Sequence, residues 1–132
     1  MTGLELSDTE KLAVQETFAA ATRAGDVDAS MALFEPDAEV WHNHDEVAVG
    51  VELAGRGLAW IHRRVPDATW EDLAVLPTPE GFLWRALMTG HCDGKPIRIH
   101  TCSVVTLASS ARLRRIDEYV DGAALASLWQ VP

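Results

Sequence analysis

The side chains best suited to acid–base chemistry gather in one short run of the chain, residues 37–45. This run brings together an aromatic ring, an amide and two imidazoles, at Trp41, Asn43, His42 and His44. Because side chains of a β-strand alternate between two faces, the ring and the amide would share one face and the two imidazoles the other. An imidazole can serve as a general base near neutral pH, so the face that points inward decides the chemistry of any pocket.

A second candidate for acid–base chemistry is Glu118, near the end of the chain. It lies between Ile116 and Val120 on the period-two pattern, so one face of a strand would carry an acid flanked by apolar groups. Such surroundings raise the pKa of a carboxyl and suit it to general acid–base catalysis. The alternative is a structural carboxylate, paired with Arg85 or exposed at a sheet edge, and both interpretations stay open.

Metal, nucleotide and nucleophile chemistry have less support. The two histidines would form half of a metal site only with a further ligand such as Asp45, His91 or His100, and no second ligand pair follows at a characteristic spacing. Residues 55–57 follow no predicted strand and lack the third glycine of a dinucleotide-binding loop. No serine or cysteine lies in a recognisable nucleophile motif. We therefore expect neither a metal nor a cofactor.

Composition predicts one folded domain over residues 1–132. Hydrophobic residues make up 48% of the chain, which is enough for a single core at this length. The net charge of -9 would repel nucleic-acid phosphates and anionic lipid, so neither is an expected partner. No apolar run reaches the roughly 18 residues that a membrane span requires, and no basic region with an apolar core opens the chain. These features indicate a cytoplasmic protein.

The two cysteines are predicted to stay reduced. Cys92 and Cys102 flank a turn-like segment, residues 93–96, and a tight hairpin there would place Cys102 opposite a residue near Arg85. The two thiols would then lie roughly 23 Å apart along the sheet, far beyond the reach of a disulfide.

Helical signals dominate the first part of the chain. Ser7 and Glu10 form a capping box, and apolar residues follow at helical spacing until Gly25 can close a first helix. A shorter second helix is expected to reach Phe34, because Pro36 disfavours helical geometry in the residue before it.

A strand is expected over residues 38–43, and the segment after it is ambiguous. Alternating valines in residues 47–53 suit a strand, whereas the apolar positions that follow suit a helix. Gly55 and Gly57 each cost a helix interior up to about 1 kcal/mol. We favour a helix over residues 52–64.

The rest of the chain reads as strands separated by Gly, Pro and Ser turn signals. Four strands are expected, over residues 69–76, 82–92, 97–108 and 113–120. A short closing helix should cover residues 123–129, which end in Trp129. The predicted fold class is therefore α+β, with three N-terminal helices, a curved and mostly antiparallel sheet, and a short C-terminal helix.

The register of the last hairpin decides which side chains face Glu118. A three-residue turn would place Glu118 opposite Cys102, whereas a four-residue turn would place it opposite Ser103. The pocket wall would accordingly contain either Thr101 and Ser103 or His100 and Cys102, and both registers stay open.

Three signatures stand in order along the chain: AGDVD at residues 24–28, PDAEVWHN at residues 36–43 and RIDEYVD at residues 115–121. With this order of elements, they resemble the SnoaL-like branch of the nuclear transport factor 2-like superfamily, which includes polyketide cyclases, ketosteroid isomerases and limonene epoxide hydrolases. The resemblance implies a conical fold whose helices and curved sheet enclose a deep apolar pocket, in a homodimer packed through the sheets.

Limonene epoxide hydrolase-like members imply one set of roles for the candidate residues. An aromatic and an amide on their first strand hold a nucleophilic water, which matches Trp41 and Asn43. An acid on their last strand activates that water, which matches Glu118. Arg85 matches an arginine on a middle strand, although Leu87 stands where these members have the partner acid.

Ketosteroid isomerase-like members imply a different base, because theirs lies on the first strand close to the position of His42. A SnoaL-type cyclase needs mainly one base and a shaped apolar cavity, and Glu118 would be that base. A strand that turns Trp41 and Asn43 inward turns His42 outward unless a bulge intervenes, so these roles compete.

We therefore expect a pocket for a small, largely apolar molecule, lined by Trp41, Trp60 and Trp84. The expected chemistry is cofactor-free isomerisation, cyclisation or hydrolysis, with Glu118 as the first candidate base and His42 as the second. Asn43 would position substrate or water. Arg85 would orient Glu118 or an anionic intermediate. A non-catalytic binding or interaction module of the same fold is the alternative.

Overall fold

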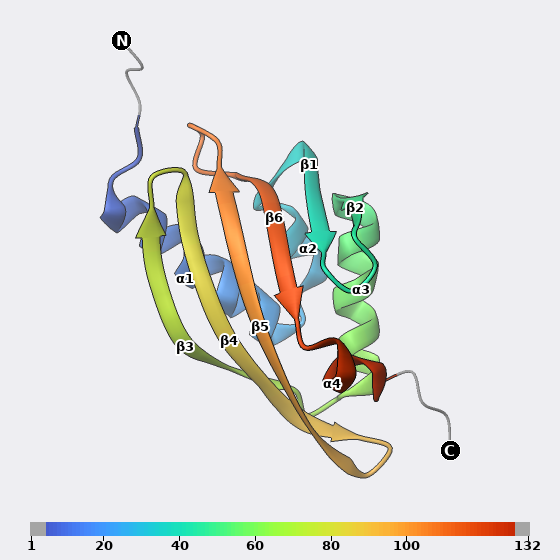
Figure 1. Cartoon of the computed structure of the whole chain (residues 1–132). Helices are drawn as coiled ribbons and strands as arrows, with labels where there is room; N and C mark the ends of the chain where they lie inside the picture. Colours follow the sequence, from blue (N-terminus) through green and yellow to red (C-terminus); the bar gives the residue numbers. More distant parts are fainter. Residues whose placement is uncertain (1–4, 129–132) are drawn as a thin grey trace.

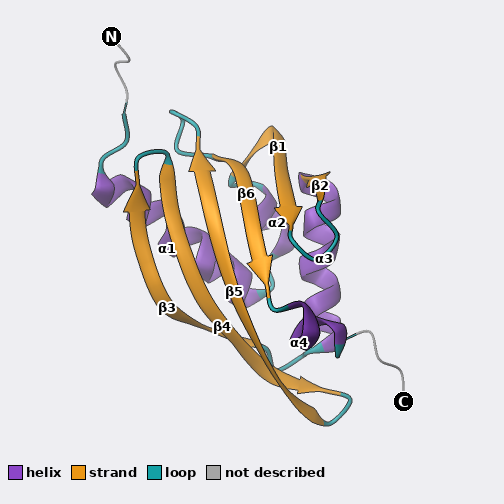
Figure 2. Ribbon diagram, viewed as in Figure 1, coloured by secondary structure: helices purple, strands orange, loops and turns teal. Residues whose placement is uncertain are grey.

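The protein, seen here as a computed structural model, is described over residues 5–128 as a layer of helices on a six-stranded sheet (Figures 1 and 2). The elements in chain order are α1 (Asp8–Ala24), α2 (Val27–Met31), β1 (Phe34–His42), β2 (Val47–Gly50), α3 (Val51–Arg64), β3 (Thr69–Thr78), β4 (Gly81–Cys92), β5 (Lys95–Leu107), β6 (Leu113–Val120) and α4 (Gly122–Ala126). The helices α1, α2 and α3 lie behind the curved sheet in Figure 1. This arrangement confirms the predicted α+β class.

The sheet brings the first and last strands of the chain together. Its order is β2-β1-β6-β5-β4-β3, with β1 and β6 parallel and the other neighbours antiparallel.

Within residues 5–128, no helix is long and apolar enough to cross a membrane. We call the face covered by α1–α3 the inner face of the sheet and the opposite face the outer face.

Helix α1 has the ends that the sequence predicts. The Ser7 hydroxyl accepts a hydrogen bond from the Glu10 amide at 3.1 Å, and the Glu10 carboxylate accepts one from the Ser7 amide at 2.9 Å. At the other end, Gly25 adopts a left-handed conformation with φ of 66°, which side chains with a Cβ rarely adopt.

The second helix is shorter than predicted, and the strand after it is longer. α2 ends at Met31 instead of reaching Phe34, and Phe34 already pairs with Leu113 of β6. Pro36 therefore lies inside β1, where the register shifts between Phe34 and Glu39. A proline is tolerated at such an irregularity because no ladder hydrogen bond is required of it there.

The ambiguous segment contains both a strand and a helix. Residues 47–50 form β2, which pairs with β1, and α3 begins at Val51, one residue before its predicted start. Gly55 is buried where α3 crosses α2, and a Cβ on it would lie 2.5 Å from the sulfur of Met31. The glycine is thus required for close helix packing, which offsets its cost to the helix.

A β-bulge settles the register of the last hairpin. The turn itself has three residues, since the Ala108 amide donates to the Arg112 carbonyl at 2.9 Å. Thr106 nevertheless pairs with Arg115, and Leu107 with Leu113, so Arg114 is an extra residue on β6. The shift by one places Ser103 opposite Glu118.

Two apolar clusters form the core between the helices and the inner face. In the first, Phe18 of α1 makes edge-to-face contacts with Phe34 and Trp84, both with ring centroids 5.8 Å apart. The second joins the far end of β4 and β5 to the segment around α4. Both cysteines are free, and Cys102 pairs with Arg85 as predicted. The predicted closing helix is observed as α4, while Trp129 lies outside the described residues.

Candidate acid–base site

Four adjacent strands place one polar residue each in a row on the inner face. Trp84 of β4 pairs with Ser103 of β5, Ser103 pairs with Glu118 of β6, and Glu118 pairs with His42 of β1. Residues that pair directly across strands project to the same face. Because Trp84 and Ser103 are buried beneath the helices, Glu118 and His42 point the same way.

Glu118 and His42 are the centre of this row. Their Nε2 and Oε1 atoms lie 3.8 Å apart, too far for a direct hydrogen bond but close enough for one polar group to contact both. The side chains keep 28% and 27% of their surface exposed. Solvent or a small molecule can therefore reach a carboxyl and an imidazole that otherwise lie on the covered face of the sheet.

Burial raises the pKa of Glu118 above its usual value, because the packed surroundings disfavour the charged carboxylate. Positive charge on His42 and on His44 acts in the opposite direction, as does hydrogen bonding by the Ser103 hydroxyl. The pKa shift thus comes from desolvation that outweighs three favourable contacts. A carboxyl of this kind exchanges protons closer to neutral pH than a surface glutamate does.

His44 extends the site toward solvent. Its ring centroid lies 5.4 Å from that of His42, and its Nε2 lies 3.7 Å from the Asp45 carboxylate. The sequence predicted that the two imidazoles share a face, and their rings do lie side by side. The described residues contain no group of three His, Cys, Asp or Glu side chains able to hold a metal ion.

Asn43 uses its side chain to continue the pairing of β1 with β6. Its amide nitrogen donates to the Val120 carbonyl at 3.3 Å, and its amide oxygen accepts from the Val120 backbone at 2.8 Å. Its own backbone amide donates to the Glu118 carbonyl at 3.1 Å. Asn43 therefore holds the end of β1 against the backbone of Glu118 and Val120 at the end of β6.

Trp41 and Arg85 lie on the outer face, away from Glu118. Trp41 packs edge-to-face on Tyr119 with ring centroids 5.4 Å apart, and Tyr119 alternates with Glu118 along β6. Arg85 is exposed and pairs with Cys102, which alternates with Ser103. The structure thus brings His42 to Glu118 and separates both from the aromatic and the arginine that the resemblance matched.

The remaining two tryptophans contribute to the helix-covered side. Trp84 is buried and its indole donates to Asp72 at 2.7 Å, so it forms the buried end of the row that runs from Trp84 to His42. Trp60 is half-buried on α3 and packs against the second core cluster beside Ile61. Helix α3 packs on β1 and β2, while α4 packs on β5, so Glu118 on β6 lies between the two helices.

Sequence reasoning left Ser103 open and missed the carboxyl–imidazole pair of Asp67 and His91 altogether. Asp67 and His91 meet on the other side of the molecule, beside a surface cavity described below. They are 24 residues apart in a loop and a strand, and no local pattern connects them. A loop between the expected helix ending at residue 64 and the expected strand beginning at residue 69 could be predicted, but its close approach to β4 is a tertiary feature.

These observations define a class of protein: a conical α+β domain with an acid–base pair on the inner face of its sheet. The profile of the SnoaL-like domain family matches residues 14–116, which is most of the chain. The chain belongs to this family. No curated protein sequence matched it.

Solved structures with the same fold come from several organisms. PrhC from Penicillium brasilianum superposes with a TM-score of 0.82 at 12% identity, covering 92% of this chain and 86% of that one. A protein described as a candidate SnoaL-like polyketide cyclase from Jannaschia gives 0.81 at 17%, covering 98% and 99%. An LEH-like epoxide hydrolase from M. tuberculosis gives 0.72 at 16%, covering 92% and 90%. At these identities the likeness shows the fold alone.

Proposed function

We propose that this protein is a cofactor-free acid–base enzyme that acts on a small, largely apolar molecule. The observation that supports this most is the Glu118 carboxyl, whose pKa is raised and which lies 3.8 Å from His42 on the helix-covered face. A base with a pKa closer to neutral and an adjacent imidazole suit proton transfer or water addition. The reaction class is therefore isomerisation, cyclisation or hydrolysis.

In this proposal Glu118 is the general base. Its Oε1 takes a proton from a substrate carbon or from a water, and the electron pair left behind moves onto a substrate oxygen or forms the new bond. His42, whose Nε2 lies 3.8 Å from Glu118 Oε1, stabilises the developing negative charge when it is protonated, or returns the proton. Asn43 acts as a positioning residue, since it fixes the strand ends on either side.

The ligand side of the site is proposed to be formed by the half-buried apolar residues of α3 and α4. Trp60 and Ile61 come from α3, and Ala124 comes from α4. Apolar side chains that stay partly exposed on the helices facing Glu118 would contact an apolar ligand while the carboxyl meets its reacting atom. Trp41 and Arg85 have no part in this proposal because they lie on the other face.

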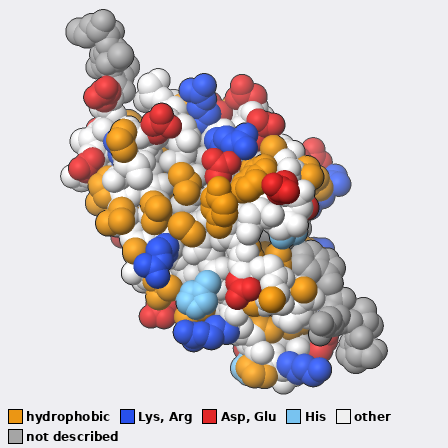
Figure 3. All heavy atoms as spheres, in the orientation of Figure 1, with side chains coloured by type: hydrophobic (Ala, Val, Ile, Leu, Met, Phe, Trp, Pro, Cys, Tyr) orange, Lys and Arg blue, Asp and Glu red, His pale blue; other side chains and the backbone are white. Residues whose placement is uncertain are grey.

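A homodimer packed through the outer face is proposed with it. Figure 3 shows hydrophobic side chains gathered across this face of the sheet. Leu76, Val104 and Tyr119 contribute, with 56%, 38% and 49% of their surface exposed. Covering such a patch with a second copy removes apolar area from water. Light scattering should return about twice the chain mass of 14.4 kDa, and a monomer would refute the dimer without touching the fold.

The proposal places the protein in the cytoplasm and gives it no nucleic-acid partner. The free thiols of Cys92 and Cys102 are typical of a reducing compartment. The net charge of -9 opposes binding to phosphate backbones. Fractionation of the source cells and a filter-binding assay with duplex DNA would test the two statements.

A non-catalytic binding module of the same fold is the second candidate, and Asn43 favours it. The amide that would hold a nucleophilic water is already committed to the Val120 backbone in both directions. The two candidates predict different behaviour of Glu118 once a ligand is known. Co-purification followed by mass spectrometry is the direct way to identify that ligand.

Replacing Glu118 by glutamine tests the proposed function. Glu118→Gln keeps the shape of the side chain but removes the base, so turnover of the identified ligand should fall at least about a hundredfold. Asp117→Asn is the matched control, because Asp117 neighbours Glu118 on β6 but points to the outer face, where it pairs with Arg115. Unchanged turnover in Glu118→Gln, with collapse in His42→Ala, would make His42 the base instead. Binding of the ligand without any turnover by the parent chain would leave the binding module.

A further inference from the structure

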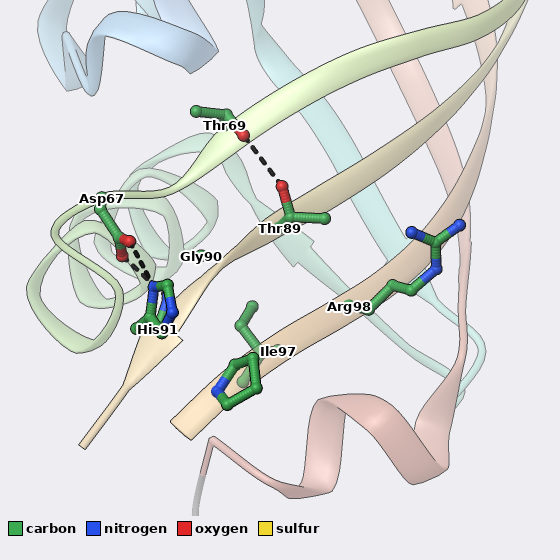
Figure 4. Close-up of a pocket in the computed structure, with 8 residues that line it drawn as sticks. Asp67, Thr69, Thr89, Gly90, His91, Ile97 and Arg98 are labelled. Carbon is green, nitrogen blue, oxygen red and sulfur yellow. Dashed lines mark hydrogen bonds and ion pairs between the residues drawn. The ribbon is translucent and has the colours of Figure 1, made fainter. Parts of the chain in front are cut away.

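A cavity of about 490 Å³ opens at the far end of β3, β4 and β5, away from Glu118 (Figure 4). Its lining residues come from the loop before β3 and from three neighbouring strands: Asp67, Thr69, Thr89, Gly90, His91, Pro96, Ile97 and Arg98. Thr89 and His91 continue the alternation that begins with Arg85, so they belong to the outer face. The cavity is therefore separate from the acid–base site on the inner face.

One wall of the cavity depends on the absence of a side chain at Gly90. A Cβ on Gly90 would lie 2.5 Å from the Cγ1 atom of Val65 and 3.0 Å from the Asp67 carboxylate. Only glycine thus lets the loop before β3 pack this closely on β4. The close approach brings Asp67 against His91, where Oδ1 accepts from the His91 backbone at 2.8 Å and Oδ2 lies 2.7 Å from Nδ1.

The pairing with Asp67 orients the imidazole of His91. A carboxylate oxygen only accepts, so the Nδ1 atom carries the proton and donates it to Asp67. The Nε2 atom on the other side of the ring points away from Asp67 and becomes a donor when the ring is protonated. Both oxygens of Asp67 are engaged by His91, so the carboxylate is held against β4.

The other polar groups of the cavity are also mainly donors. Arg98 is exposed on β5, and within residues 5–128 its guanidinium has no hydrogen-bond or ion-pair partner. The hydroxyls of Thr69 and Thr89 lie 3.0 Å apart, so one donates to the other and the second keeps its proton for a ligand. Pro96 adds apolar surface beside these donors, whereas the side chain of Ile97 is buried in the second core cluster.

We propose that this cavity binds a small organic carboxylate that carries a compact apolar group. The carboxylate accepts from the guanidinium of Arg98 and from a threonine hydroxyl, with the His91 ring at its side. The apolar group lies on Pro96. An arginine without a protein partner is well suited to this class of ligand, because its planar fork matches the two oxygens of a carboxylate.

The site is independent of both the acid–base site and the proposed dimer surface. Leu83 and Val104, in the apolar part of the outer face, pair with one another six residues before Thr89 along β4. Six residues of strand span roughly 20 Å. A carboxylate bound beside Thr89 would therefore leave the apolar patch free, and its binding does not require Glu118.

The test is an NMR titration of the full chain with benzoate, which combines a carboxylate with a compact apolar ring. Backbone and side-chain signals of Thr89, Gly90, His91 and Arg98 should shift together and saturate. Arg98→Gln should weaken binding at least about tenfold, as expected for the loss of a charge-assisted contact. The matched control is Arg85→Gln, which removes an exposed arginine from the same face and should leave the affinity unchanged.

Two further probes test separately whether the negative charge and the apolar group of the ligand are needed for binding. Benzamide has nearly the shape of benzoate but no charge, and inorganic phosphate is an anion without an apolar group. Weaker binding of both would support the proposal. Equal affinity for benzamide, stronger binding of phosphate, equal loss in the two arginine variants, or no saturable shift at the cavity would each overturn it. Unchanged spectra of the variants away from the cavity show that they remain folded.

Discussion

Two carboxyl–imidazole pairs on opposite faces of the sheet, Glu118–His42 and Asp67–His91, share the chemistry of their side chains but differ in almost every other respect. Glu118 and His42 are 3.8 Å apart on the inner face and keep 28% and 27% of their surface exposed. Asp67 and His91 are 2.7 Å apart on the outer face, with 54% and 59% exposed. The pKa of Glu118 is raised, whereas that of Asp67 is lowered.

The difference shows whether hydrogen bonding or desolvation dominates the pKa of each carboxyl. Side-chain and backbone hydrogen bonds from His91 lower the pKa of Asp67, because little desolvation opposes them. At Glu118 desolvation is the largest cause, and the charges of His42 and His44 offset it only in part. A carboxyl beside an imidazole thus has a raised pKa where desolvation dominates and a lowered pKa where hydrogen bonds dominate.

Gly90→Ala should break the outer pair and leave the inner one intact. The new Cβ would overlap Val65, which is fully buried and cannot move away, so the free energy of unfolding should fall by about 2–3 kcal/mol. The His91 ring signals should also lose their sensitivity to Asp67. Gly57→Ala is the control, since its Cβ would meet nothing within 4 Å and helix propensity predicts a gain of up to about 1 kcal/mol. Urea unfolding measures both, and equal effects of the two variants would contradict the role given to Gly90.

Asn43→Ala should weaken the support of the inner pair. The Val120 amide, which is buried, loses its acceptor, and the free energy of unfolding should fall by about 1–2 kcal/mol. Asn43→Asp keeps an acceptor for that amide and should recover part of the loss. It also brings a negative charge next to Glu118, so it should raise the pKa of Glu118 further. Recovery in Asn43→Asp without any change in that pKa would place Asn43 farther from the site than the structure shows.

Glu118 and Asp67 should change the free energy of unfolding with pH in opposite directions. From the ordinary value of 4.5 up to its raised pKa, the folded state holds a proton on Glu118 that the unfolded state has lost. The free energy of unfolding therefore falls as pH rises through that window. Asp67 does the reverse, since its contribution is complete above 3.8 and is lost as pH falls through its lowered pKa.

Urea unfolding over a pH series measures these slopes. Relative to the parent chain, Glu118→Gln should flatten the decline above pH 4.5, and Asp67→Asn should flatten the acid limb below pH 3.8. A steeper decline in Glu118→Gln would mean that desolvation is not the dominant effect at this carboxyl.

The smallest expected effect belongs to His44. His44→Gln removes a positive charge that lowers the pKa of Glu118, so that pKa should rise. His42→Gln should raise it more, because the His42 charge is the larger of the two opposing causes. Carbon-detected NMR titration of Glu118 compares the two variants directly. A larger effect of His44→Gln would reverse the order of the two imidazoles in the site.

Local patterns were enough to predict that Glu118 shares a face with Ile116 and Val120, but neither that this face is the inner one nor which residues are its partners. The period-two spacing of Ile116, Glu118 and Val120 holds in β6, because all three lie beyond the bulge at Arg114. The bulge itself has no local signal. Because of the bulge, the hairpin has a three-residue turn and yet pairs Glu118 with Ser103, the register expected for a four-residue turn.

The roles implied by the resemblance compete at Trp41 and His42, and the alternation of β1 shows which of the two residues shares the face of Glu118. Both strands β1 and β6 keep strict alternation at this point, so the face of Glu118 receives His42 and excludes Trp41. The amide of Asn43 was expected to meet water or substrate. Its use by Val120 follows from the end of β1, where the backbone leaves two groups of β6 unpaired, and that depends on tertiary structure.

The parallel pairing of β1 with β6 also sets the time at which the site can exist during synthesis. The clamp between Asn43 and Val120 spans 77 residues, nearly the longest separation that a strand pair in this chain can have. Contacts of such long sequence separation form late, because the entropy of closing the intervening loop is lost before they are made. Until the last strand leaves the ribosome, β1 has an open edge and Glu118 has no imidazole beside it. Before β6 is made, β1–β2 and β3–β5 are two separate sets of strands, and the carboxyl of Glu118 meets the imidazole of His42 only after β6 has joined them.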